Sequence, residues 1–168
     1  MARLDSLDER ILSSLQADGR LTMKALAEEI GMSSPAVIER VRRLEERGML
    51  TGYRGLVDPA AIGRPLSVML FATVPHAKHE EFLNTLREHP AVEDVTRVGG
   101  VRNFIVRAHF SGTEELEELM DTLGESSDTI ESEMVLSSPL RTTAIMPPPE
   151  AVSRRKRGIR RRQSATEQ

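Results

Sequence analysis

Arginine and glutamate side chains gather along one short segment of the chain, at a spacing that could contact DNA. Between residues 34 and 46, Val37, Val41 and Leu44 recur at helical spacing and would bury one face of a helix. Charged residues fill much of the opposite face. Arginine can pair with guanine edges or with phosphates, and glutamate can accept a hydrogen bond from the amino group of cytosine. The candidate DNA-contacting residues are Ser33, Ser34, Pro35, Ala36, Glu39, Arg40, Arg42 and Arg43.

The same charges are also compatible with an ordinary solvated helix. In that interpretation Arg42 and Arg43 only balance nearby glutamates, through pairs three or four residues apart. The choice between the two interpretations depends on the elements that precede this segment.

Three short helices are expected in the first third of the chain. A capping-box pattern at residues 6–9 begins the first helix, which Asp18-Gly19 ends, and Thr22 can cap the second. Only Gly31-Met32 separates the second helix from the third, and glycine permits a tight turn there. This spacing is typical of a helix-turn-helix, whose recognition helix enters the major groove of DNA. We therefore predict a winged-helix-like helix-turn-helix DNA-binding domain at residues 1–55.

The period of the apolar residues changes from helical to alternating after a linker at residues 56–64. Residues 65–146 are expected to form a strand, a helix, two strands, a helix and a strand. The expected ranges are 66–74, 78–88, 92–98, 103–110, 111–124, and a last strand through 134–136 and on to 145. The βαββαβ order predicts a ferredoxin-like regulatory domain, so the fold class is α+β.

The first strand of this domain carries bulky apolar residues on both faces. A single layer of helices covers only one face of such a sheet. The other face, with Met69 and Phe71, is therefore expected to pack against a second subunit. Scattered apolar residues on a surface need no partner, and that alternative stays open.

The formal net charge of −3 conceals an asymmetry along the chain. Residues 1–55 contain nine Lys/Arg and nine Asp/Glu, and residues 56–150 contain seven and sixteen. Residues 151–168 contain seven Lys/Arg and one Asp/Glu. A triple proline begins the stretch 147–168, which we predict to be a disordered basic tail that contacts a polyanion.

Other chemistry is not indicated by the residue types. The chain has no cysteine, and its four histidines are scattered, so neither a metal site nor a cofactor is expected. No catalytic cluster, phosphate-binding loop or membrane-spanning run stands out, and no signal peptide is recognisable. The expected compartment is the cytoplasm.

Ordered motifs along the chain resemble the leucine-responsive/asparagine-type (Lrp/AsnC, feast/famine) regulators. They are Leu4-Asp5-Ser6-Leu7-Asp8-Glu9-Arg10-Ile11-Leu12, Asp18-Gly19-Arg20, Leu26-Ala27, Gly31-Met32-Ser33, Arg40-Val41, Arg43-Leu44-Glu45, Gly52-Tyr53, Val57-Asp58-Pro59, Gly63 and Arg141-Thr142-Thr143. The resemblance covers about residues 4–146. It implies a homodimer joined through the C-terminal sheets, often assembled into tetramers or octamers, that binds double-stranded DNA and responds to amino acids or related metabolites.

The resemblance also implies an effector site near the turn between the second and third strands. Here that turn supplies the candidate effector-binding residues Gly99, Gly100, Arg102 and Asn103. The family commonly has Asp where Asn103 stands and an acidic or polar residue where Arg102 stands. We therefore expect an effector recognised mainly through a carboxylate, or no amino-acid effector at all. A simple turn with a solvated Arg102 is the alternative.

The sequence thus predicts a sequence-specific DNA-binding transcription regulator, modulated by an amino acid or a related small carboxylate. Two alternatives stay open. One is an architectural DNA-binding protein that needs no ligand. The other is a small enzyme, since a ferredoxin-like fold by itself does not settle function.

Overall fold

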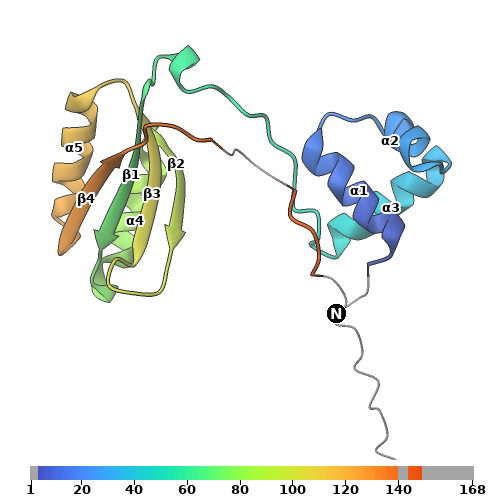
Figure 1. Ribbon diagram of the computed structural model, residues 1–168. Coiled ribbons are helices and arrows are strands. Elements are labelled where there is room, and N and C mark those ends of the chain that lie inside the picture. The colour runs from blue at the N-terminus through green and yellow to red at the C-terminus, as the bar shows by residue number, and fades with distance from the viewer. Residues whose placement is uncertain (1–3, 140–143, 149–168) are drawn as a thin grey trace, which may run out of the picture. The chain divides into compact units, whose positions relative to one another are not determined.

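The computed structural model describes residues 4–139 and 144–148, which belong to two compact units (Figure 1). Of the described residues, 4–52 and 144–148 belong to the first unit and 53–139 to the second. The predicted strand residues Arg141-Thr142-Thr143, and the predicted disorder of the tail beyond Pro148, lie outside the described residues.

Among the described residues, the first unit contains three helices: α1 (Ser6–Ala17), α2 (Met23–Ile30) and α3 (Ser34–Glu46). Each buries an apolar stripe in one shared core, as the sequence predicts. The buried residues are Ile11, Leu12, Leu15, Leu26, Ala27, Ile30, Val37, Val41 and Leu44. Gly31 ends α2 with φ of 79°, a left-handed conformation that glycine adopts without strain.

The cap of α1 differs from the predicted one by one residue. Asp5, and not Ser6, is the N-cap: its carboxylate accepts hydrogen bonds from the backbone N–H groups of Leu7 (3.0 Å) and Asp8 (2.9 Å). The Asp8 carboxylate in turn accepts from the backbone N–H of Asp5 (3.3 Å). The capping box at residues 6–9 is therefore corrected to Asp5 and Asp8. Aspartate and serine both cap well, so residue type alone did not distinguish the two registers.

The second unit follows the predicted βαββαβ order. Its elements are β1 (Leu66–Thr73), α4 (His79–Glu88), β2 (Val92–Arg97), β3 (Phe104–Phe110), α5 (Thr113–Gly124) and β4 (Thr129–Met134), with short 3-10 helices η1 (Ala60–Ile62) and η2 (His76–Lys78). The strands form one sheet in the order β2-β3-β1-β4, and all neighbouring strands are antiparallel. No helix in the described ranges is long and apolar enough to span a bilayer.

The last strand begins earlier than the sequence predicts. β4 occupies Thr129–Met134, whereas the predicted strand runs through 134–136 and on to 145, and residues 135–138 lie outside any strand. Its backbone pairs with β1 from Thr73↔Thr129 to Val68↔Met134. β4 is an edge strand with mostly exposed polar side chains. Backbone pairing rather than an apolar alternation forms it, which explains why the pattern missed it.

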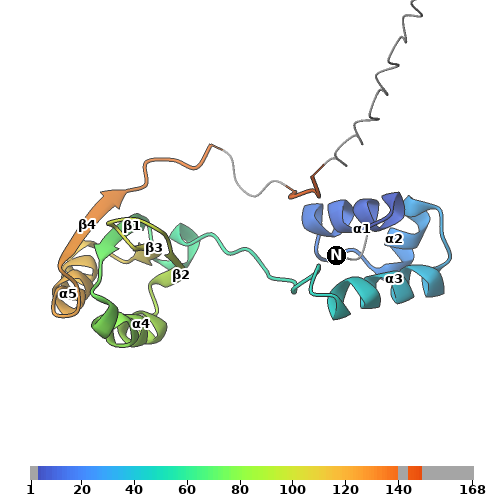
Figure 2. The same cartoon turned by 90° about the horizontal axis from the view of Figure 1, so that it is seen from below.

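Both helices of the second unit cover the same face of the sheet (Figure 2). On that face Val68, Leu70 and Ala72 of β1 are buried in a core shared with β3, α4 and α5. Met69 and Phe71 lie on the opposite face and are half-buried. The side chains of β1 therefore alternate between a helix-covered face and a face that the described helices leave open.

A hydrogen-bonded clamp joins α5 to the segment before β1. The Glu115 carboxylate accepts from the backbone N–H and the hydroxyl of Ser111, each at 2.8 Å, and from Arg64 Nη1 at 2.8 Å. Arg64 also donates to the backbone carbonyl of His109 at 3.0 Å. The backbone hydrogen bond from Ser111, followed by the one from Arg64, lowers the pKa of Glu115 to about 2.

We expect Glu115→Gln to lower the free energy of unfolding at pH 7 by about 1–2 kcal/mol, because the hydrogen bonds to a charged group are removed. The folded-state pKa lies below the ordinary value of 4.5. The stabilisation is therefore present above pH 4.5 and disappears as the pH falls toward 2. Urea unfolding followed by circular dichroism at pH 7, 4 and 3 measures this. Glu118→Gln, at an exposed position of α5, is the control. A difference between wild type and Glu115→Gln that does not shrink toward low pH would contradict the assignment.

Candidate nucleic-acid and effector sites

The orientation of α3 is fixed by its buried residues. Val37, Val41 and Leu44 lie in the core with exposed fractions of 0–5%, so the rest of the helix circumference faces outward. Ser33 is the N-cap and Pro35 stands in the first turn, where a missing N–H costs nothing. α3 therefore presents its N-terminal turn and its charged face away from the core, as the helix-turn-helix prediction requires.

Four charged residues of α3 are paired with one another. Arg42 donates from Nε and Nη2 to both carboxylate oxygens of Glu39, at 2.9 and 2.8 Å, and from Nη1 to Glu46. Arg43 Nε lies 3.2 Å from Glu39 Oε1. The hydrogen bond from Arg42 lowers the pKa of Glu39, and the same bond raises the pKa of Arg42. These four side chains are each about half exposed, so DNA could reach them in this arrangement.

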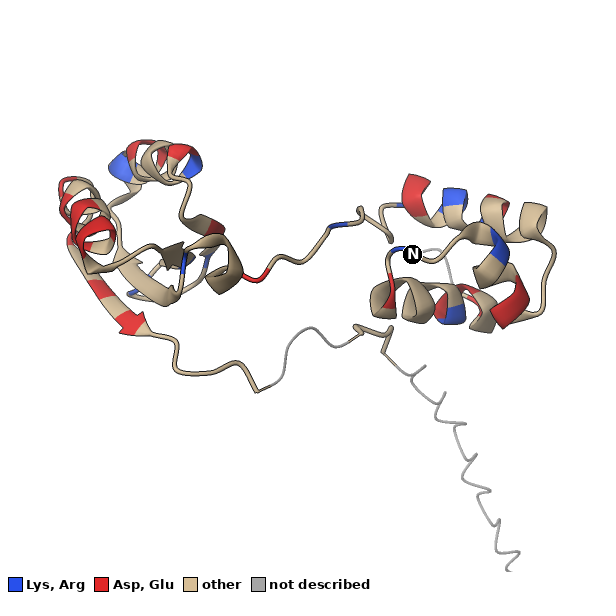
Figure 3. Ribbon diagram, turned by 90° about the horizontal axis from the view of Figure 1, so that it is seen from above, with Lys and Arg blue, Asp and Glu red and all other residues tan. Residues whose placement is uncertain are grey.

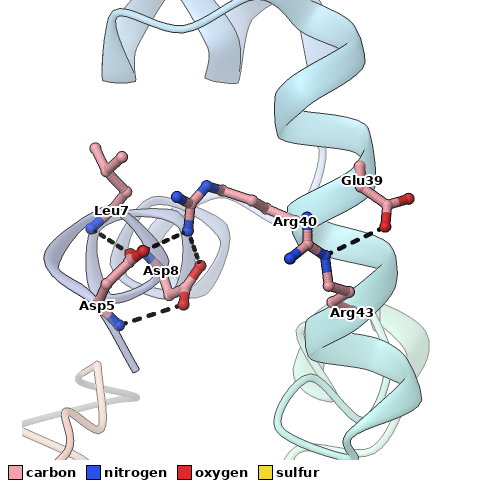
Figure 4. Close-up of polar contacts among 6 residues, drawn as sticks. All are labelled: Asp5, Leu7, Asp8, Glu39, Arg40 and Arg43. Atoms are coloured by element: carbon pink, nitrogen blue, oxygen red, sulfur yellow. Dashed lines mark hydrogen bonds and ion pairs between the residues drawn. The ribbon is translucent and has the colours of Figure 1, made fainter. Parts of the chain in front are cut away.

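Arg40 forms ion pairs at the N-terminus of α1. Its Nη1 atom is 2.7 Å from Asp5 Oδ2 and 2.6 Å from Asp8 Oδ1, so the side chain reaches from α3 to the N-terminus of α1 (Figure 4). Its side chain is 23% exposed and that of Asp8 only 11%. Arg40 therefore joins two helices, which favours a structural role, and its contact with DNA stays a prediction. The N-terminus of α1 is distant in sequence, so spacing within α3 did not reveal this contact.

One outward residue of α3 was missed at the level of sequence. Ile38 is 50% exposed and lies directly before Glu39 on the helix. An apolar side chain at such a position can contact the methyl group of thymine. The signal that could have found it is that Ile38 falls outside the apolar stripe of Val37, Val41 and Leu44.

The turn between β2 and β3 uses one of its candidate residues internally. Asn103 donates from Nδ2 to the carbonyl of Val74 (2.8 Å) and accepts at Oδ1 from the N–H of Val74 (2.9 Å). Both ends of the amide are thereby engaged. The side chain therefore ties the turn to the end of β1, and a contact of Asn103 with an effector stays a prediction.

Arg102 lies beside an acidic partner on the open face of the sheet. Its Nη2 atom is 2.6 Å from Glu131 Oε2 of β4, and its guanidinium carbon lies 5.6 Å from the centre of the Phe71 ring. Both charged side chains are about half exposed. Gly100 has φ of 126°, a conformation in which a side chain would be strained. The turn thus holds a cation and an anion side by side at the surface.

A row of hydrogen-bonded polar side chains lies on the same face of the sheet. His109 Nδ1 lies 2.8 Å from Ser67 Oγ, and His109 Nε2 lies 2.9 Å from Glu93 Oε2, so the three side chains link β1, β3 and β2. No group of three or more potential metal ligands is gathered in residues 4–139 and 144–148. Acidic residues are concentrated on α5 and β4 (Figure 3). The ion-paired arginines Arg42 and Arg43 lie on α3.

Comparisons with known proteins match both units. A family model for winged helix-turn-helix DNA-binding domains matches residues 4–51, and one for the Lrp/AsnC ligand-binding domain matches residues 67–145. The HTH-type transcriptional regulator LrpC of Bacillus subtilis is 31% identical over 128 residues, which cover 76% of this chain and 89% of LrpC. The regulator AldR of Mycolicibacterium smegmatis is 35% identical over 129 residues, covering 74% of this chain and 75% of AldR.

Solved structures give the same result. The structure of Bacillus subtilis LrpC has a TM-score of 0.78 at 29% identity and covers 84% of this chain and 100% of LrpC. A Neisseria meningitidis transcriptional regulator, solved as its L-Met complex, has a TM-score of 0.78 at 26% identity. The match covers 85% of this chain and 96% of that chain. These relatives are transcriptional regulators and not enzymes, which removes the enzyme alternative. With both halves matched in order, this chain belongs to the Lrp/AsnC family of DNA-binding transcription regulators.

Proposed function

We propose that this regulator reads a specific operator through α3 of each subunit of a homodimer, and that an amino acid or related small carboxylate changes its affinity for DNA. The observation that carries the first part is the outward face of α3, where half-exposed Arg42 and Arg43 follow an N-terminal turn in which Pro35 is exposed and Ser34 and Ala36 are partly exposed. A helix placed in this way fits the major groove, with its first turns nearest the base edges.

The open face of the sheet supports assembly into a dimer. Met69, Phe71 and Ile105 form a half-buried apolar centre there, on neighbouring strands β1 and β3. A second copy of the chain would cover these side chains, and further assembly into tetramers or octamers would follow the family. Two recognition helices would then meet two half-sites of one operator.

The pair of Arg102 and Glu131 supports an amino acid as the effector. An amino acid carries a carboxylate and an ammonium group on neighbouring atoms. Arg102 can bind the carboxylate through a guanidinium fork, and Glu131 can bind the ammonium. The acid that the family commonly has at position 103 is thus replaced in this chain by one from β4. The L-Met named for the Neisseria meningitidis relative agrees with this class of ligand.

Arg43→Ala and Arg40→Ala should separate the DNA-contacting role from the structural one. We expect Arg43→Ala to weaken operator binding by roughly 1–3 kcal/mol, if it reads a base, without changing the midpoint of thermal unfolding. Arg40→Ala should instead lower the free energy of unfolding by about 1–2 kcal/mol, because the nearly buried Asp8 loses its partner. Fluorescence anisotropy on a duplex enriched by the wild-type protein from a random library, with thermal melts alongside, measures both. Wild-type DNA affinity for Arg43→Ala would show that α3 is misassigned.

The effector site is tested with two variants of its ion pair. Arg102→Ala should abolish the effect of both amino acids and simple carboxylates on DNA affinity. Glu131→Gln should abolish the effect of amino acids alone, because only the ammonium partner is removed. A thermal-shift screen of amino acids and their deaminated analogues finds the ligands, since a ligand that binds the folded protein raises its stability. A ligand that acts equally on wild type and both variants binds elsewhere. If no metabolite shifts the melting temperature or the DNA affinity of the wild type, the ligand-independent architectural function is favoured.

The basic residues of the tail give a prediction about salt. Residues 151–168 carry seven Lys/Arg against one Asp/Glu, which suits binding to phosphates that does not depend on sequence. Removing residues 150–168 should weaken operator and random-sequence binding by the same factor. The plot of log affinity against log salt should also flatten, by about 0.9 for each phosphate that the tail neutralises in the full-length protein. An unchanged slope would show that the tail has no part in DNA binding.

A further inference from the structure

We propose that Glu39 sets the sequence selectivity of α3, by holding Arg42 and Arg43 in ion pairs until a matching base pair takes their place. The inference rests on the proposed function, because it requires α3 to lie in the major groove. It goes beyond that function by assigning selectivity to an acidic residue instead of the arginines.

Glu39 is the acid that the two arginines share. Arg42 uses two nitrogens on it, at 2.9 and 2.8 Å, and Arg43 Nε lies 3.2 Å from the same oxygen that accepts from Arg42 Nη2. Figure 4 shows the contact between Arg43 and Glu39, with Arg40 beside it on α3 reaching to Asp5 and Asp8. The Glu39 side chain is 46% exposed, so it stays accessible while it binds both cations. The charge of the face is therefore largely compensated in the free protein.

Generic DNA does not benefit from this arrangement. An arginine that turns to a phosphate leaves Glu39, whose carboxylate then faces the negative backbone without its cations. Surface ion pairs are weak, so breaking the pair is not the main cost. The main cost is the repulsion between the released carboxylate and the phosphates, or the acceptor atoms that guanine and thymine present in the major groove.

A matching base pair removes that cost. Cytosine presents its N4 amino group and adenine its N6 amino group in the major groove, and either can donate to the Glu39 carboxylate. Once Glu39 has this partner, Arg42 and Arg43 are free to contact phosphates or a neighbouring guanine. Reading one base and releasing two cations thereby become a single coupled step.

Glu46 provides a matched comparison on the same helix. It also accepts a hydrogen bond from Arg42, and its side chain is 55% exposed. Replacing Glu46 with Gln removes one negative charge from the same helix, as E39Q does. Glu46 lies two turns further along α3, at its C-terminal end, away from the turns that meet the base edges. A pure charge effect should appear in both variants, and the proposed selectivity should depend on Glu39 alone.

The test compares E39Q and E46Q in the full-length chain. Affinities are measured for the duplex enriched by the wild type and for a shuffled duplex of the same composition. We expect E39Q to bind the shuffled duplex several-fold more tightly, with a salt slope steeper by about 0.9 for each additional phosphate neutralised. The ratio of specific to shuffled affinity should fall by about tenfold for each half-site, the value of one base contact. E46Q should raise both affinities by a similar factor and keep the ratio.

Enrichment from the random library, repeated with each variant and with E39A, reads the selectivity directly. E39A should lose the preference at one cytosine or adenine position of the half-site, and E39Q should favour adenine there, because a glutamine amide pairs with adenine. E46Q should keep the wild-type preference. Equal decreases of the affinity ratio in E39Q and E46Q, or an unchanged enriched sequence for E39A, would overturn the proposal. If E39Q, E46Q and Arg43→Ala all bind like the wild type, then α3 does not contact DNA and the proposed function fails instead. Glutamine and glutamate have similar helix propensities, and thermal melts verify that all three variants fold.

Discussion

The charged face of α3 is exposed to solvent because the apolar stripe on the opposite side of the helix is buried. Val37, Val41 and Leu44 lock the rotation of the helix against α1 and α2, and the left-handed Gly31 sets the angle at which α3 leaves α2. With that rotation fixed, every outward side chain follows from the helical period of 3.6 residues. A change that turned α3 by one residue position would bury charge and expose the core.

Those features that arise from local patterning could be predicted from the sequence. The three helices, their core residues and the alternation of β1 all depend on which residues recur at a period of 3.6 or 2. These periods can be recognised without knowledge of the rest of the fold, because each element must bury one of its own faces whatever it packs against. Connections between neighbouring elements are usually short, so this order of helices and strands is compatible with only a few sheet topologies. The observed strand order β2-β3-β1-β4 is one of them.

Features that depend on contacts distant in sequence could not be predicted in this way. Arg40 bonds across to Asp5 and Asp8, and Asn103 bonds to Val74, 29 residues before it. In each case a side chain that looked free to bind a ligand is needed by the fold. The general reason is that most polar side chains at the edge of a buried region form hydrogen bonds, and only the neighbouring residues of the folded chain determine the partner.

The cations of α3 and of the β2–β3 turn that are proposed to meet ligands share one further property: Arg42, Arg43 and Arg102 are each already paired with a carboxylate of their own chain. Arg42 is held by Glu39 and Arg102 by Glu131. Exchanging one half-exposed ion pair for another gains little free energy by itself. The discrimination between ligands must therefore come from what the displaced carboxylate contacts next. An amino group satisfies it at both places, on cytosine or adenine for Glu39 and on an amino acid for Glu131. A phosphate offers no such group and leaves Glu39 without a partner. A simple carboxylate contacts Arg102 alone and is therefore expected to bind more weakly than an amino acid. The acids of the two sites, and not the arginines that attract anions in general, therefore decide which ligand is chosen.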